Sequence, residues 1–274
     1  PDLIILGHAD LISAQQISEL REDYPNTRFG QWFLDPLNKK GPDYERNKKR
    51  ILDKIDVVDA SFLTTSPDAL NFLKNKKSFF IPNPSDSSFE ILNNYKNPCN
   101  VDVFFALSHG VHRGVLKSGK TDDRITFLNK LVSSTPDIKF DIYGIKKVQP
   151  IWADHYFKTI QNAKMGLNLS RGDAIKYYSS DRITQIIGNG LVCLIDEKTQ
   201  YNNFFNSNEM VFYKNVSDLS EKITKISKDE KLRRKIAMNG KKKYMKYFNS
   251  DLVAQYIINK TLDIKAKTKN FWER

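Results

Sequence analysis

Residues 164–205, KMGLNLSRGDAIKYYSSDRITQIIGNGLVCLIDEKTQYNNFF, decide the fold of this chain. Their first part, KMGLNLS (164–170), is a short apolar run typical of a strand, and a polar loop follows it. SDRITQIIGNG (180–190) then predicts a helix that its last glycines bring to an end. LVCLID (191–196) predicts the next buried strand. A strand, a helix and a strand in this order predict a parallel α/β sheet.

The same alternation extends outward in both directions. The expected strands cover 2–8, 27–36, 60–66, 78–86, 101–107, 139–144, 164–170, 191–196 and 210–214, and the expected helices cover 12–25, 46–59, 66–76, 122–135, 152–163, 180–190 and 218–247. The polar, Asn-rich stretch 87–100 interrupts the pattern and predicts a linker. We therefore expect two Rossmann-like, doubly wound α/β domains facing a cleft, a small or truncated one over 1–90 and a larger one over 98–249.

The composition excludes several classes of protein. The 274 residues include 17 Phe and 12 Tyr, too many for a disordered chain, and no apolar run approaches the roughly 18–20 residues of a spanning helix. Lys and Arg exceed Asp and Glu by 44 to 32, a net charge of +12. Because this excess is spread over predicted helices such as 46–50 and 231–235, it indicates solvated faces and no nucleic-acid partner. Attraction to an anionic membrane or an acidic glycan stays open.

The start of the helix 180–190 predicts an anion site. Free backbone N–H groups at a helix N-terminus, placed at the carboxyl edge of a parallel sheet, suit a diphosphate. Ser180 and Asp181 open this helix, and three basic side chains flank it: Arg171, Lys176 and Arg182. No cluster of carboxylates or histidines with metal-ligand spacing accompanies them, and Cys99 and Cys193 stand in unrelated contexts. We therefore expect neither a metal site nor a disulfide framework.

These motifs resemble the C-terminal domain of GT-B glycosyltransferases, most closely the family-1-type, CgeB-like (spore-protein-like) group. The resemblance lies in NLSR (168–171), DRITQIIGNG (181–190) and the strand after it. TRFGQWFLDP (27–36) and FFIPNPSD (79–86) are similar to the family's N-terminal domain and its interdomain entry. VDVFFAL (101–107) with DDRITFLNKL (122–131) is similar to the first strand and helix of its C-terminal domain. In that fold the final segment, here 250–274, crosses back to the first domain.

The resemblance implies a hexosyltransferase-type enzyme. It would move a sugar from a nucleotide-diphosphate-sugar donor to a glycan or glycolipid acceptor of the cell surface, with no cofactor beyond the donor and no metal ion. The superfamily has a Glu on the ribose five residues before the helix-ending glycine, where this chain has Gln185. Its partner Glu is absent as well, since Tyr177 stands there. A catalytically silent GT-B domain that binds nucleotide or glycan is therefore the alternative.

Two further groups of residues complete the expected site. SHGVHRGVLKSGK (108–120) follows a strand and brings His109, Arg113 and Lys117 to its carboxyl end, near the donor phosphates and the transferred sugar in the resembled family. His8 and Asp35 end the first two strands, and either could accept the proton of an acceptor hydroxyl. The chain begins at Pro1, which is typical of a processed or excised segment. We expect a cytoplasmic location, and a peripheral contact with the anionic inner membrane face stays open.

Overall fold

The computed structural model describes residues 1–107, 122–145 and 148–273. The chain divides into two compact units. Unit 1 contains residues 1–84, 172–180 and 247–274, and unit 2 contains residues 85–171 and 181–246. Each unit is built on a parallel sheet of its own. Among the described residues, no helix combines the length and the apolar composition that crossing a bilayer requires.

The sheet of unit 1 has four parallel strands in sequential order: β1 (Leu3–Gly7), β2 (Arg28–Phe33), β3 (Ala60–Leu63) and β4 (Ser78–Phe80). The connections include α1 (Ala14–Asp23), α2 (Tyr44–Leu52) and two short 3₁₀ helices. Right-handed crossovers that always step in the same direction place their helices on one face. On that face Ile17 of α1 packs on Phe29, and Ile51 of α2 belongs to the cluster around Phe33.

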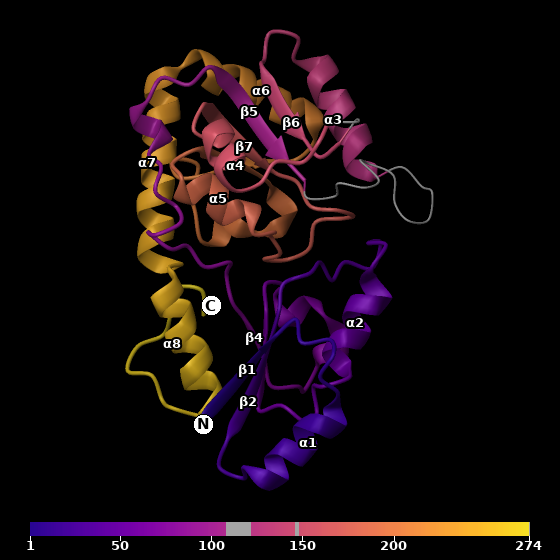
Figure 1. Cartoon of the computed structure of the whole chain (residues 1–274). Coiled ribbons are helices and arrows are strands. Elements are labelled where there is room, and N and C mark those ends of the chain that lie inside the picture. Colours follow the sequence, from indigo (N-terminus) through magenta and orange to yellow (C-terminus); the bar gives the residue numbers. More distant parts are fainter. Residues whose placement is uncertain (108–121, 146–147, 274) are drawn as a thin grey trace. The chain divides into compact units, whose positions relative to one another are not determined.

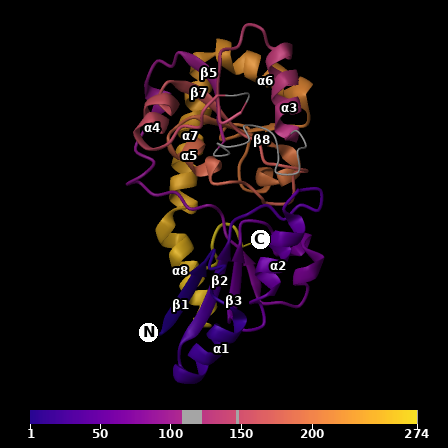
Figure 2. The ribbon, with the colours of Figure 1, turned by 45° about the vertical axis from the view of Figure 1, so that its right-hand side comes forward.

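The opposite face of this sheet is covered by α8 (Ser250–Thr261), as Figures 1 and 2 show. Tyr256 of α8 lies edge-on to Phe62 of β3 and Phe79 of β4, with ring centroids 6.3 and 6.1 Å away. Gly30 of β2 allows the close approach of α8, because a Cβ at this position would lie 3.1 Å from Oγ1 of Thr261. A segment far away in the sequence thus completes the core of unit 1.

The sheet of unit 2 has five parallel strands: β5 (Val101–Ala106), β6 (Phe140–Tyr143), β7 (Ala163–Asn168), β8 (Val192–Asp196) and β9 (Val211–Tyr213). Their order is β6-β5-β7-β8-β9, so the direction of winding reverses between β5 and β7. This reversal makes the sheet doubly wound, and ligands of such sheets bind where the strand order reverses, beyond the carboxyl ends of the strands.

Helices cover both faces of this sheet (Figure 1). On one face, α3 (Asp123–Ser134) and α6 (Val216–Lys228) pack over a cluster that includes Val103 and Leu194. The other face carries α4 (Ala153–Ile160) and α5 (Arg182–Gly188), through Tyr156 on Phe104 and Ile186 on Gly166. The long helix α7 (Glu230–Tyr247) approaches Ile187 of α5 at Gly240.

Two predicted helices differ from the structure. The one expected over 66–76 is a pair of 3₁₀ helices, Pro67–Ala69 and Asn71–Leu73, because Leu70 between them is extended. The hydroxyl of Ser66 donates to Asp68, 2.6 Å away, and caps no backbone amide. The helix expected over 180–190 spans only Arg182–Gly188, and the Asp181 side chain before it makes no capping hydrogen bond.

The segment 87–100, predicted to be a linker, is an integral part of unit 2. Asn94 is fully buried, and its Nδ2 donates to the carbonyl oxygens of Ile160 and Ala163 at 2.7 and 2.9 Å. The carbonyl of Asn94 in turn accepts a 2.8 Å hydrogen bond from Arg233, whose side chain is also fully buried. One residue of the basic run 231–235 therefore holds this segment in place, although the sequence predicted a solvated face there.

Candidate functional site

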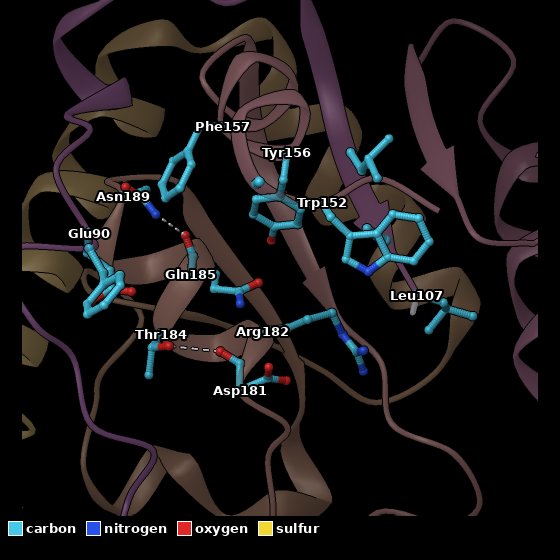
Figure 3. Close-up of a pocket in the computed structure, with 14 residues that line it drawn as sticks. Glu90, Leu107, Trp152, Tyr156, Phe157, Asp181, Arg182, Thr184, Gln185 and Asn189 are labelled. Carbon is cyan, nitrogen blue, oxygen red and sulfur yellow. Dashed lines mark hydrogen bonds between the residues drawn. The ribbon is translucent and has the colours of Figure 1, made fainter. Parts of the chain in front are cut away.

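A cavity of unit 2 lies next to the carboxyl end of β5, at the point where the strand order reverses. Its volume is about 460 Å³, within the range of roughly 300–1,000 Å³ that is usual for small-molecule sites. Figure 3 shows the side chains around it. The lining residues are Phe89, Glu90, Ala106, Leu107, Ile151, Trp152, Ala153, Tyr156, Phe157, Asp181, Arg182, Thr184, Gln185 and Asn189.

One wall of the cavity is the polar face of α5. Arg182, Gln185 and Asn189 are spaced by three and four residues, which places them on one side of the helix. Arg182 is half-buried, and its Nη2 donates to the carbonyl oxygen of Leu169 at 2.8 Å, while its guanidinium stands 5.4 Å above the ring of Phe105. Nδ2 of Asn189 donates to the carbonyl oxygen of Gln185 at 2.9 Å. The cation thus has a fixed position at the cavity wall.

The opposite wall comes from α4 and the loop before it, and it is aromatic. Trp152 is 59% exposed and lines the cavity. Tyr156 lies edge-on to Phe104, and burial raises the pKa of its phenol well above the usual range. Trp272, by contrast, is buried against Phe248 and Tyr256. The cavity therefore joins an aromatic wall to a polar one.

Three residues predicted for the site fall outside the described part of the chain: the candidate catalytic residue His109 and the candidate phosphate partners Arg113 and Lys117. Arg171 belongs to unit 2, where its Nε lies 3.6 Å from Oδ2 of the buried Asp122. Burial opposes ionisation of this carboxyl, but hydrogen bonds and charge from Arg124, together with the charge of Arg171, hold the pKa of Asp122 at about 2. Arg171 therefore neutralises a buried carboxylate of its own unit.

Lys176 and Ser180 lie in unit 1, although the sequence interpretation assigned both to the nucleotide-binding domain. Lys176 pairs with the carboxylate of Asp68 and stands 5.1 Å over the ring of Tyr177. The neighbouring Ser179 accepts hydrogen bonds from Nδ2 of Asn83 through its carbonyl oxygen and its hydroxyl, at 2.9 and 3.1 Å. These contacts incorporate the segment 172–180 into unit 1, while Asp181, Arg182 and Gln185 line the cavity of unit 2.

In unit 1 the two candidate bases meet at one cation. Arg50 of α2 donates from Nη1 to Oδ2 of Asp35 at 2.9 Å, and its Nη2 lies 3.2 Å from Nδ1 of His8. It also binds both carboxylate oxygens of Asp10, at 2.7 and 2.5 Å. The Arg50 hydrogen bond lowers the pKa of Asp10, although its small degree of burial opposes this. Arg50 could not be distinguished in the sequence, since it belongs to the basic run 46–50.

The contact with Arg50 fixes what His8 can do. A guanidinium has only donors, so Nδ1 of His8 must accept, and the proton of a neutral imidazole then sits on Nε2. In this arrangement the outer nitrogen of His8 is a donor rather than a base. Asp35 keeps its second carboxylate oxygen as an acceptor for a proton. His8 also has a left-handed backbone (φ 48°), which is uncommon for a residue with a side chain and which directs it off the end of β1.

The described residues contain no group of three or more His, Cys, Asp or Glu side chains that could hold a metal ion. The polar groups of the lining residues are one guanidinium, two amides, the hydroxyls of Thr184 and Tyr156, the indole N–H of Trp152 and the carboxyl groups of Glu90 and Asp181. Glu90 could not be recognised from the sequence, because a single carboxylate in an Asn-rich stretch gives no pattern.

Solved structures with the same fold come from glycosyltransferases and related enzymes. S. aureus TarM in complex with fondaparinux, alpha-GlcNAc-glycerol and UDP superposes with a TM-score of 0.62 at 12% identity, covering 94% of this chain and 55% of that one. Anabaena HepE with UDP and glucose gives 0.64 at 10% identity, covering 94% and 77%. Sucrose-phosphate synthase from Thermosynechococcus elongatus gives 0.57 at 13%, covering 94% and 72%. The chain thus spans about half the length of TarM.

These likenesses define the class of the chain, an α/β protein with the GT-B fold, and they confirm the fold predicted from the sequence. Residues 124–259, nearly half of the chain, match the sequence model of the family described as "Glycosyl transferase-like". No curated protein matches the sequence significantly. Placement in the CgeB-like group stays a prediction.

Proposed function

We propose that this chain is a glycosyltransferase that moves a sugar from a nucleotide-diphosphate donor to a hydroxyl of a glycan or glycolipid. The observation that carries the proposal is the cavity of unit 2, in which Arg182 and Gln185 meet an aromatic wall where the strand order reverses. The "Glycosyl transferase-like" match covers most of the residues that line it. HepE, which shares the fold, has been crystallised with UDP and with UDP-glucose.

The chemistry of the cavity suits the three parts of a nucleotide-diphosphate sugar. The exposed ring of Trp152 offers a face on which a base can stack. The amide of Gln185 can both donate to and accept from ribose hydroxyls. Arg182 supplies fixed positive charge for the diphosphate, whose negative charge grows as the sugar leaves. We propose that this cation stabilises the leaving group without a metal ion.

The transfer step needs a base for the acceptor hydroxyl. We propose Asp35 of unit 1 as the candidate for that role, since its second carboxylate oxygen can accept a proton. In the transfer step the acceptor oxygen bonds to the anomeric carbon, and the bond between that carbon and the diphosphate breaks. The electron pair of the broken bond stays on the diphosphate. His8, with its proton on Nε2, would hydrogen-bond an acceptor oxygen and orient it. Arg50 holds both side chains and so acts as a positioning residue.

The charge of the chain supports an anionic acceptor or an acceptor at an anionic surface. A basic residue close to an anionic leaflet contributes on the order of 1 kcal/mol of attraction, and the net charge is +12. A glycolipid at the cytoplasmic membrane face and a polyanionic glycan both fit this balance. Location in the cytoplasm stays part of the proposal.

A binding screen followed by a transfer assay tests the function. UDP, GDP and CMP are titrated into the chain by calorimetry, and each corresponding nucleotide sugar is then assayed for hydrolysis or transfer. Arg182→Ala should weaken binding of the preferred diphosphate by about 1.5–3 kcal/mol, the contribution of a hydrogen bond to a charged group. Lys158→Ala, which removes an exposed cation from α4, serves as the matched control and should bind normally.

The outcomes separate the two candidate functions. Binding with turnover of a nucleotide sugar supports the transferase. Tight binding of a nucleotide without turnover of any sugar donor identifies the silent GT-B module, which the replacement of the superfamily's glutamate by Gln185 favours. If no nucleotide binds, the cavity is not a donor site and the proposal is wrong.

A further inference from the structure

The cavity contains one carboxylate that the proposed function leaves without a role. Glu90 is only 8% exposed, yet it lines the cavity together with Gln185 and Asn189 (Figure 3). Burial raises the pKa of the Glu90 carboxyl, because its charged form loses the solvation that water would provide. A buried carboxylate at the wall of a ligand cavity calls for hydrogen-bond donors, and a ligand can supply them.

The chain holds Glu90 in this position from three directions. Its Oε2 accepts a 2.6 Å hydrogen bond from the amide of Asp86, which closes the turn before it. Nζ of Lys241 on α7 donates to the carbonyl oxygens of Glu90 and Leu92, at 3.1 and 2.6 Å. On the side of α5, a Cβ at Gly188 would stand 2.3 Å from Cγ of Glu90. Only glycine there leaves room for this side chain.

The position along α5 indicates which part of a ligand Glu90 meets. Arg182 lies in the first turn of the helix, and Gln185 lies about one turn further along. Gly188, which Glu90 contacts, lies six residues after Arg182, about 9 Å along the helix axis at ~1.5 Å per residue. A diphosphate at Arg182 would therefore lie away from the carboxylate and escape its repulsion. The ribose, which follows the diphosphate in a nucleotide, would reach the region of Gln185 and Glu90. Its two hydroxyls are donors, and carboxylates bind them in other α/β nucleotide sites.

We propose that Glu90 is the ribose-binding carboxylate of this chain, and that it accepts a hydrogen bond from a ribose hydroxyl of the nucleotide donor beside Gln185. This proposal rests on the proposed function and deepens it. The charged hydrogen-bond acceptor for the ribose would then come from Glu90, which precedes β5, whereas α5 offers only the amide of Gln185 at this place. A nucleotide without these hydroxyls would leave the buried carboxylate with only the donors that the protein itself supplies.

The test compares ribose and deoxyribose ligands. UDP, 2′-deoxy-UDP and 3′-deoxy-UDP are titrated calorimetrically, or the same set with the base that the screen prefers. The wild type should bind the ribonucleotide roughly 10- to 100-fold more tightly than at least one deoxy form, as a hydrogen bond to a charged group implies. Glu90→Gln keeps the shape and an acceptor for the Asp86 amide, and it should reduce this preference to a few-fold.

A second variant keeps the proposal testable if Glu90→Gln folds poorly. Gly188→Ala adds one methyl group, contacts no expected ligand atom and favours a helix, but it displaces Glu90. It should lose the ribose preference to the same degree. Gln185→Ala, which removes the neighbouring amide, is the comparison, and it should weaken ribonucleotide binding while part of the preference persists.

Three results would overturn the proposal. If the wild type binds ribo- and deoxyribonucleotides equally, Glu90 has no ribose role, while the donor site itself stands. If Glu90→Gln and Gly188→Ala weaken all nucleotides by the same factor and keep the preference, Glu90 is merely structural. If no nucleotide binds to the wild type, both this proposal and the proposed function fail.

Discussion

Because α8 covers one face of the sheet of unit 1, we expect the side chain of Tyr256 on this helix to contribute strongly to the stability of the unit. Tyr256 is 5% exposed and packs edge-on against Phe62 and Phe79 on one side and against Trp272 on another. Tyr256→Ala removes the ring from a closed aromatic cluster. Truncation of large buried aromatics costs about 3–5 kcal/mol, a large fraction of the roughly 5–15 kcal/mol that stabilises a typical domain.

Hydrogen exchange followed by mass spectrometry measures this loss strand by strand. In Tyr256→Ala the best-protected amides of β2 and β3 should exchange at least about 100-fold faster, because each 1.4 kcal/mol corresponds to a factor of ten. Ile258→Ala on the same helix, where the side chain is 36% exposed, is the control and should change exchange little. Unchanged protection in β2 and β3 of Tyr256→Ala would refute the conclusion that α8 completes the core of unit 1.

Three further predictions concern stability and the reaction. Gly166→Ala should destabilise unit 2 by about 1–3 kcal/mol through overpacking, since its Cβ would stand 2.5 Å from Cγ1 of Ile186. Thermal unfolding measures this loss. Gly7→Ala, whose Cβ would meet no atom within 4 Å, is the control and should unfold at the temperature of the wild type. Asp59 has its pKa at about 2, because hydrogen bonds from Arg21, the Phe29 amide and Arg28 outweigh its burial. The pKa of Asp59 is lower in the folded than in the unfolded protein. Its ionised carboxylate should therefore contribute about 1–2 kcal/mol to the free energy of unfolding above pH ~4, and this contribution should be lost as the pH falls toward 2. An Asp59→Asn variant whose acid unfolding parallels that of the wild type would contradict this. Sugar transfer should persist in EDTA, and loss of activity that only Mn²⁺ or Mg²⁺ restores would disprove the metal-free mechanism.

The order of strands and helices was readable from the sequence, because each signal lies within a few neighbouring residues. The apolar run 191–196 and the glycines before it predicted a buried strand after a helix, and β8 begins at Val192. His8 and Asp35 were found by the same local logic, since each follows a strand and parallel strands end at a common edge. Their shared contact with Arg50 confirms that this edge brings them together.

Burial of single polar residues could not be predicted in this way. Glu90 and Arg233 lie in stretches whose composition indicates solvent exposure, yet they are 8% and 0% exposed. Whether such a side chain is buried depends on segments remote in sequence, here α5 and α7 over Glu90 and the backbone of 94–97 around Arg233. The hydrophobic periodicity of a segment depends only on its own residues and therefore does not indicate which remote segments pack on it.

The sequence by itself determined that this chain is an α/β protein with parallel strands, because hydrophobic spacing and helix-ending glycines act over short distances. Only the tertiary structure decided which residues share a site. It placed 172–180 in unit 1 and brought Trp152 and Glu90 to the cavity beside Arg182. The physical reason is that a cavity is lined by whichever segments pack around it, and that packing is set by contacts between residues far apart along the chain.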